Sequence, residues 1–299
     1  MPSPRPPSTF VISMTPFARD GALDEDGLRA HLRRLAAAGI GVYVGGSGSG
    51  EGYTLSPAEV GRVLEIGAEE LRGRVPARAM GVEPRTAAQM IELGRVAAAA
   101  GLDAMQVYSL DIGHGNRPRP AELERYFCDV LDAVGLDAVV SSHFAAGYFV
   151  PLDVVARLLE RFPQVIGINC TNPDVTYLLR LLEVVDGRAD VHVGGPMQAL
   201  TCLALGGQGY LSSEGNLAPA LCVEVITRWA AADLAGSAAA FARVLRLFAA
   251  TQDAGGIAAA KAALGRLGLP GGWPRPPRLP VEGPALDALV AVARELGLS

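Results

Sequence analysis

Short apolar runs alternate with longer amphipathic stretches along most of this 299-residue chain. A run of about 4–8 mainly apolar residues between turn-forming residues is typical of a strand buried on both faces of a sheet. Eight runs of this kind predict strands, which begin at Phe10, Gly41, Ala77, Ala104, Ala138, Val165, Asp190 and Gly209. Polar and Gly-rich residues follow these runs, as expected where loops leave a sheet.

Between these runs, apolar residues recur at helical spacing and predict helices over 24–38, 57–72, 86–100, 120–134, 151–161, 174–185, 196–204 and 218–232. Strands that alternate with helices in this way are expected to be parallel and joined by right-handed crossovers. Eight such units predict an α/β fold closed into a TIM (β/α)8 barrel. An open, doubly wound sheet is the structural alternative.

Three more helices are predicted after the eighth unit, over 237–252, 257–267 and 283–296. The Pro-rich segment Pro270–Pro280 separates the last of them from the others. We therefore expect a barrel over 1–233 and a helical appendage over 234–299, packed on the barrel as part of the same domain.

Composition supports a compact enzyme-like domain. Hydrophobic residues make up 50% of the chain and charged residues 19%, which argues against disorder. The net charge is −5 and no Lys/Arg run is present, so nucleic acid is not an expected partner. A length near 300 residues suits one barrel, because this fold needs roughly 250 residues.

The four cysteines, Cys128, Cys170, Cys202 and Cys222, lie in apolar segments without a C-x-x-C pair. Buried free thiols in a reducing compartment are the expected explanation. The first seven residues form a short Pro-rich arm without the apolar core of a signal peptide. No stretch looks long and apolar enough to span a bilayer. We expect a cytoplasmic protein with no membrane partner.

Several segments together resemble the dihydrodipicolinate synthase / N-acetylneuraminate lyase family. Residues 44–56, VGGSGSGEGYTLS, resemble its G-[ST]-T-G-E-x-x-x-L-[ST] loop after strand two, and residues 206–219, GGQGYLSSEGNLAP, resemble its strand-eight element. Residues 259–269 and 274–280 resemble its C-terminal helix and R-P-P-L-x-P connector, and residues 15–17 match its first strand. The resemblance implies a barrel with C-terminal helices, a small keto-acid substrate and a homo-oligomer, either a dimer or a tetramer.

The chain departs from this family at two strand ends. The family reads G-[IV]-K-[ED] at strand six, and its lysine forms an imine with the substrate; residues 167–170 here read GINC, which places Asn169 at the lysine position. At strand five the family has a proton-relaying tyrosine, whose position falls on Ser141 or Ser142, followed by His143. The only lysine in the chain is Lys261, which aligns with a helix outside the family's active site.

The loop after strand two is the best-supported binding feature. Ser47, Gly48, Ser49 and Gly50 offer hydroxyls and exposed amides that can hold a carboxylate, and a following helix would add favourable potential. The resembled family binds its keto-acid carboxylate here. A plain tight turn is the structural alternative. Glu51 is expected to pin the loop rather than to react.

The candidate reacting groups lie at strand ends: Tyr108, Ser141, Ser142, His143, Asn169 and Glu214. Asn169 cannot attack a carbonyl because its lone pair is delocalised, but its amide can donate to an enolate oxygen. His143 suits acid–base work near neutral pH, or makes a structural hydrogen bond. Tyr108 is the candidate for a family tyrosine that reaches a neighbouring subunit, or a half-buried rim residue.

Glu214 is a candidate proton acceptor with a raised pKa, or a partner of Arg78. Among the other histidines, His114 is a weaker candidate, His192 is expected in the core and His31 on a solvated helix surface. Cys170 should point away from Asn169, because side chains alternate along a strand.

The sequence thus predicts a lyase acting on a small carboxylate or keto acid without a lysine imine, a cofactor or a metal. Aldol cleavage or condensation, dehydration and cyclisation all fit. The alternative is a catalytically inactive descendant that serves as a small-acid binding or scaffold protein. A third possibility, an imine enzyme with a relocated lysine, would depend on Lys261.

Overall fold

The computed structural model describes residues 5–143 and 146–298. Eight strands pair in chain order and close into a barrel, as predicted, so the open doubly wound alternative is excluded. The strands are β1 Ser8–Ile12, β2 Gly41–Val44, β3 Ala77–Ala79, β4 Ala104–Val107, β5 Asp137–Ser142, β6 Val165–Cys170, β7 Asp190–Gly194 and β8 Gly209–Ser212. Short apolar strands suit this fold, because each is buried between the barrel interior and a layer of helices.

The helices follow the predicted order. They are α1 Glu25–Ala37, α2 Pro57–Leu71, α3 Ala87–Ala100, α4 Pro120–Ala133, α5 Leu152–Arg161, α6 Val175–Val185, α7 Ala199–Ala204, α8 Pro219–Ala230, α9 Leu234–Ala254, α10 Ile257–Arg266 and α11 Pro284–Glu295. α9 begins three residues earlier than predicted because the Asp233 side chain accepts a hydrogen bond from Gly236 N and caps the helix. α7 begins three residues later than predicted.

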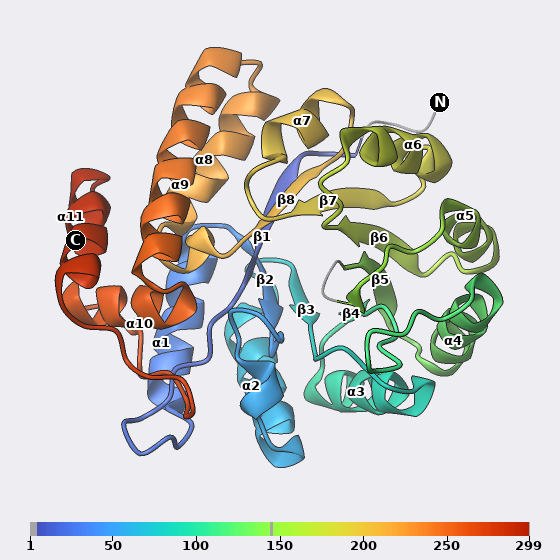
Figure 1. Ribbon diagram of the computed structural model, residues 1–299, viewed down its shortest axis with the longest axis horizontal. Helices are drawn as coiled ribbons and strands as arrows, with labels where there is room; N and C mark the ends of the chain where they lie inside the picture. The colour runs from blue at the N-terminus through green and yellow to red at the C-terminus, as the bar shows by residue number, and fades with distance from the viewer. Residues whose placement is uncertain (1–4, 144–145, 299) are drawn as a thin grey trace. The chain divides into compact units, whose positions relative to one another are not determined.

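The chain divides into two compact units. The first unit holds residues 5–7 and Arg78–Leu211, and the second holds Ser8–Ala77 and 212–298. In the first unit, α3, α4, α5 and α6 follow one another along the outside of β4, β5 and β6 (Figure 1). The register pairs Gln106 with Val139 and Ser141 with Asn169, so neighbouring strands present matched positions on each face.

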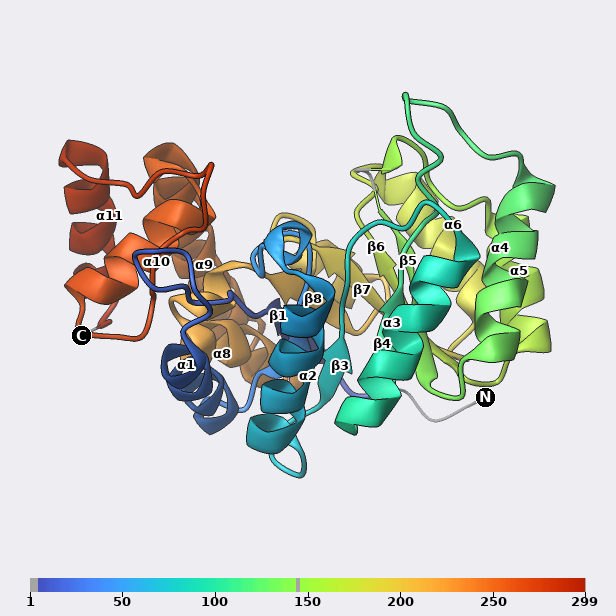
Figure 2. The ribbon, with the colours of Figure 1, turned by 90° about the horizontal axis from the view of Figure 1, so that it is seen from below.

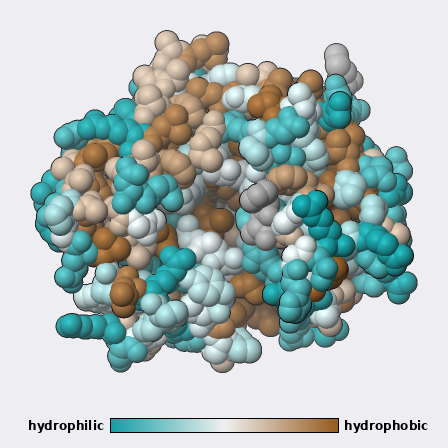
Figure 3. All heavy atoms as spheres, viewed as in Figure 1, coloured by the Kyte–Doolittle hydropathy of each residue, from teal (hydrophilic) through white to brown (hydrophobic). Residues whose placement is uncertain are grey.

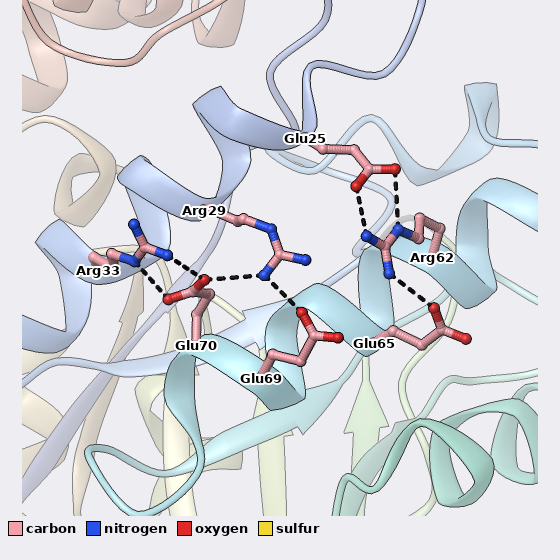
Figure 4. Close-up of polar contacts among 7 residues, drawn as sticks. All are labelled: Glu25, Arg29, Arg33, Arg62, Glu65, Glu69 and Glu70. Atoms are coloured by element: carbon pink, nitrogen blue, oxygen red, sulfur yellow. Dashed lines mark hydrogen bonds and ion pairs between the residues drawn. The ribbon is translucent and has the colours of Figure 1, made fainter.

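In the second unit, the α1–α2 pair is joined by ion pairs (Figure 4). The nearly buried Glu70 carboxylate of α2 accepts hydrogen bonds from Arg29 and Arg33 of α1. Arg62 of α2 makes a two-pronged contact with Glu25 at 2.9 and 2.6 Å. These bonds join the helix that precedes β2 in the chain to the helix that follows β2.

The three predicted C-terminal helices also lie in the second unit, where α9 packs between α8 and α11 (Figures 1 and 2). Apolar residues gather over α8 and α9 on the face in Figure 3. Among the described residues, α9 alone is long and apolar enough to cross a membrane by length and composition, so the expectation that no such stretch exists was wrong. Arg243 and Arg246 of α9 pair with Glu224 and Glu295, within the same unit.

Candidate functional site

The Gly-rich loop, residues 45–51, follows β2 in the second unit and folds back on itself. Gly52 N donates to Gly46 O at 2.9 Å, and Glu51 N donates to Gly48 O at 3.3 Å. A Cβ at Gly50 would lie 2.6 Å from Gly46 O, closer than real contacts allow. Only glycine permits this tight path, which leaves Ser49 buried and Ser47 half-buried.

The helix that was expected to add potential at this loop begins where the sequence predicted it, after a short turn. A short 3-10 turn, Gly52–Thr54, separates the loop from α2, which begins at Pro57. Ser56 caps α2 by accepting from Glu59 N, and Glu59 returns a hydrogen bond to Ser56 N. The α2 N-terminus is therefore satisfied by its own capping box. Ser47 to Gly50 can contribute their own hydroxyls and amides to an anion, and a contribution from the α2 dipole stays a prediction.

Glu51 closes the loop in the left-handed region, with φ 51°. Its fully buried carboxylate pairs with Lys261 of α10, whose ammonium also donates to Thr15 O at 2.7 Å and to Trp273 O at 3.1 Å. Glu51 thus pins the loop, as the sequence suggested. Burial lowers the pKa of Lys261, while Glu51 opposes that shift. An ammonium that donates to three oxygens has no lone pair with which to attack a carbonyl.

In the first unit, Asn169 lies near the carboxyl end of β6 and is buried. Its Nδ2 donates to Gln106 Oε1 of β4, across the intervening strand β5. Side chains two strands apart meet in this way only on the concave face of a curved sheet. The carboxamide therefore lies on the concave face of β4–β6. Sequence reasoning missed Gln106, although a single polar residue inside the apolar run of β4 was a usable signal.

The two serines of β5 lie on opposite faces. Ser141 pairs in register with Asn169, and Ser142 pairs with Cys170. The Ser142 hydroxyl accepts a hydrogen bond from Val150 N at 3.0 Å and so holds the segment that enters α5. Only Ser141 shares the face of Asn169. Burial raises the pKa of the Cys170 thiol to about 11, which keeps the thiol protonated and unreactive.

His143 directly follows β5 and lies next to two further groups. Its Nδ1 lies 3.9 Å from Glu83 Oε1, and its ring meets the Tyr108 ring edge-on, with centroids 6.0 Å apart. Burial lowers the pKa of His143, and the Glu83 carboxylate opposes that shift. Tyr108 is buried within its own chain; a role in a neighbour's site stays a prediction. We name Gln106, Tyr108, Ser141, His143 and Asn169 the strand-end group.

Glu214 lies in the second unit, in a 3-10 turn after β8, and is buried. Its carboxylate accepts hydrogen bonds from the hydroxyls of Ser212 and Ser213. Burial raises the pKa of Glu214, and these hydroxyls oppose the shift. Because burial disfavours the charged form, the Glu214 carboxylate can accept a proton more readily than an exposed one. The raised pKa that the sequence predicted for Glu214 is therefore confirmed.

The remaining histidines differ in their surroundings. His31 was expected on a solvated surface, but it is fully buried and its Nε2 lies 2.9 Å from Asn216 Oδ1. Burial lowers the pKa of His31 to about 3, so the ring is neutral and donates to Asn216. His192 is buried in β7, as predicted. His114 is exposed. Within 5–143 and 146–298, no cluster of three or more His, Cys, Asp or Glu residues could hold a metal ion.

Residues 7–296 match the Dihydrodipicolinate synthetase family. The 4-hydroxy-tetrahydrodipicolinate synthase of Hyphomonas neptunium is 33% identical over 296 residues, 95% of each chain. A second relative, 4-hydroxy-tetrahydrodipicolinate synthase 1 of Streptomyces coelicolor, is 31% identical and covers 96% of this chain and 93% of its own.

Solved structures agree with this similarity. A prophage protein of the dihydrodipicolinic acid synthase family from E. coli K12, in complex with pyruvate, aligns with a TM-score of 0.88 at 27% identity. The alignment covers 98% of this chain and 99% of that protein. The similarity thus extends over the barrel and the C-terminal helices, and this chain belongs to the dihydrodipicolinate synthetase family.

Proposed function

We propose that this protein is a lyase that acts on a small carboxylate or keto acid without forming a lysine imine. The Gly-rich loop, through Ser47, Gly48, Ser49 and Gly50, binds the substrate carboxylate. Asn169 polarises the carbonyl that an imine would otherwise activate. In barrels of this class, active sites form from the loops at the carboxyl ends of the strands, which is where these residues lie in the sequence of elements.

The position of Asn169 carries this proposal. Its carboxamide is buried on the concave face of β4–β6 and is oriented by Gln106, which takes one of the two N–H groups of Nδ2. We assign the second N–H to the oxygen that becomes negatively charged when a carbon–carbon or carbon–oxygen bond breaks next to the carbonyl. A preorganised donor at such an oxygen lowers the barrier by roughly 2.7–4 kcal/mol.

Proton transfer falls to His143. Its lowered pKa keeps the imidazole neutral near pH 7, the form that accepts a proton from a substrate hydroxyl or carbon. Tyr108, beside it, supports the ring, and Ser141 adds a hydroxyl on the face of Asn169. Glu214, with its raised pKa, is the second candidate for a proton acceptor.

The test is a screen of keto and hydroxy acids by thermal shift, followed by turnover assays on each ligand that binds. Pyruvate is the first probe, because a relative of known structure binds it. We expect binding and turnover, with Asn169→Ala lowering kcat by about 100-fold or more and Cys170→Ala, on the opposite face, leaving kcat unchanged. Binding without turnover of any ligand would instead support the inactive binding or scaffold protein.

We also propose a homo-oligomer. Val175 and Leu179, one turn apart on α6, are exposed at 44% and 42%, and a second copy of the chain is the occupant that the resemblance implies. Mass measured in solution by light scattering, for the native chain and for Leu179→Glu, checks this assembly. A native chain that runs as a monomer would contradict it.

A further inference from the structure

Lys261, the only lysine of the chain, is fully buried in α10. Each of its three N–H groups has an acceptor: Glu51 Oε2, Thr15 O and Trp273 O. Its ammonium also lies 4.6 Å from the centroid of the Phe17 ring. A buried charge is stable only when its hydrogen-bonding groups have partners. These three hydrogen bonds also fix the position of the Lys261 ammonium.

The other end of this ion pair belongs to the Gly-rich loop. Glu51 takes a left-handed conformation between Gly50 and Gly52. A Cβ on Gly50 or Gly52 would lie 2.6 Å from Gly46 O or 2.4 Å from Gly45 O, so the backbone on either side of Glu51 has little room to move. The position of the Glu51 carboxylate therefore constrains the position of the loop backbone.

The segment after α10 adds a second contact with the same region. Arg275 N lies 3.4 Å from Glu51 Oε1, and the Arg275 guanidinium donates to Thr54 O at 2.9 Å. Arg275 also pairs with Glu59, and this bond lowers the pKa of Glu59 to about 2. Trp273 pairs with Phe17 by a backbone bridge, which places the segment after α10 beside the loop after β1 (Figure 1).

We propose that Lys261 is a positioning residue: through Glu51, it fixes the Gly-rich loop in the conformation that binds a substrate carboxylate. The C-terminal helices thus take part in substrate binding although they contribute no group that touches the substrate. This inference rests on the proposed function, in which Ser47 to Gly50 bind the carboxylate. It differs from an imine role for Lys261, because here the amine never reacts.

The pair can be removed in a way that separates positioning from stability. Lys261→Met alone leaves the Glu51 carboxylate buried without its partner, which destabilises the fold. Lys261→Met combined with Glu51→Gln removes both charges, and such replacements are often neutral for stability. The double variant keeps a folded protein but lacks the ionic link to the loop. Arg266→Met, on the same helix at an exposed ion pair with Asp287, is the matched control.

The experiment measures hydrogen exchange of the peptide spanning residues 45–56, together with pyruvate affinity by calorimetry, for the full-length native chain and the three variants. We expect Lys261→Met and the double variant to exchange at least about tenfold faster in this peptide than the native chain, and to bind pyruvate on the order of tenfold more weakly, because the loop must now be ordered on binding. Arg266→Met should match the native chain in both measurements.

A double variant with native exchange and native pyruvate affinity would overturn the proposal, since loop order would then not depend on the ion pair. The exchange measurement needs no ligand. If the native chain binds neither pyruvate nor any other keto acid, the proposed function fails, whereas faster loop exchange in the variants would still support the positioning of the loop by Lys261.

Discussion

The Gly-rich loop and the strand-end group are held in place by different means. A charge pair holds the loop: Glu51, at the end of the loop, forms a fully buried ion pair with Lys261. Neutral hydrogen bonds hold the strand-end group, where Gln106 orients Asn169. Ser47 to Gly50 of the loop are proposed to bind the substrate, whereas Asn169 and His143 of the strand-end group are proposed to react with it.

This difference indicates how strongly each region constrains its own residues. A buried ion pair needs both partners, because either charge alone is costly, so the loop, Glu51 and Lys261 change together or not at all. A neutral amide group tolerates replacement more easily, because the penalty for an imperfect hydrogen bond is smaller. We therefore expect the Gly-rich loop to tolerate fewer substitutions at its buried charges than the strand-end group tolerates at its neutral side chains.

The largest effect is expected from Glu51→Gln, which leaves the Lys261 ammonium buried without a counter-charge. We expect a loss of roughly 3–5 kcal/mol in the free energy of unfolding, measured by urea denaturation. A loss below about 1 kcal/mol, the size typical of an exposed pair, would show that the loop is not held by charge.

His31, on α1, extends the comparison to pH. The folded chain holds His31 neutral, with a pKa of about 3, whereas an unfolded histidine takes up a proton near pH 6.5. Below pH 6.5 the unfolded state therefore binds a proton that the folded state does not bind. The free energy of unfolding consequently falls as the pH falls. This histidine should cost about 2 kcal/mol of stability by pH 5.

Urea denaturation at pH 7 and pH 5 measures this loss. His31→Gln keeps an N–H donor for Asn216 but cannot be protonated, so its stability should depend less on pH over this interval. An equal loss in both proteins would contradict the assignment to His31.

A smaller effect is expected from Gln106→Met, which removes the acceptor of the Asn169 hydrogen bond without changing a charge. The free energy of unfolding should fall by about 1–2 kcal/mol, less than for Glu51→Gln. Turnover should fall as well, because Asn169 loses the bond that orients it. Denaturation and kcat are measured on the same preparation; a variant with native kcat would mean that Gln106 does not orient the reacting amide.

The smallest effect is expected from Glu83→Gln. The Glu83 carboxylate raises the pKa of His143 against the effect of burial, so its removal should lower that pKa further. The acidic limb of the kcat/KM profile should then move to lower pH, because neutral His143 persists at lower pH. An acidic limb that stays in place would assign it to another group.

Much of the fold could be predicted because each strand and helix carries its own local pattern. The burial of His31 could not be predicted in this way: α1 reads as an amphipathic surface helix, and the partner of His31, Asn216, lies 185 positions away. The Lys261–Glu51 pair spans 210 positions. Long-range polar contacts of this kind leave no periodic signal in the sequence.

Within the candidate site, alternation along the strand placed Cys170 opposite Asn169, as the register shows. The same rule separates Ser141 from Ser142, although both had been proposed together. Two helix starts were predicted less well, because α7 and α9 each begin three residues away from the predicted position. Sequence thus predicts which face a residue takes better than where a helix begins.

Borohydride reduction in the presence of pyruvate, followed by the mass of the intact protein, tests the central claim most directly. An imine between a lysine and pyruvate would be reduced to a stable amine and would add mass. The account predicts an unmodified mass under conditions in which pyruvate binds, because Asn169 cannot form an imine and Lys261 is committed to Glu51. A covalent adduct that maps to Lys261 would contradict it.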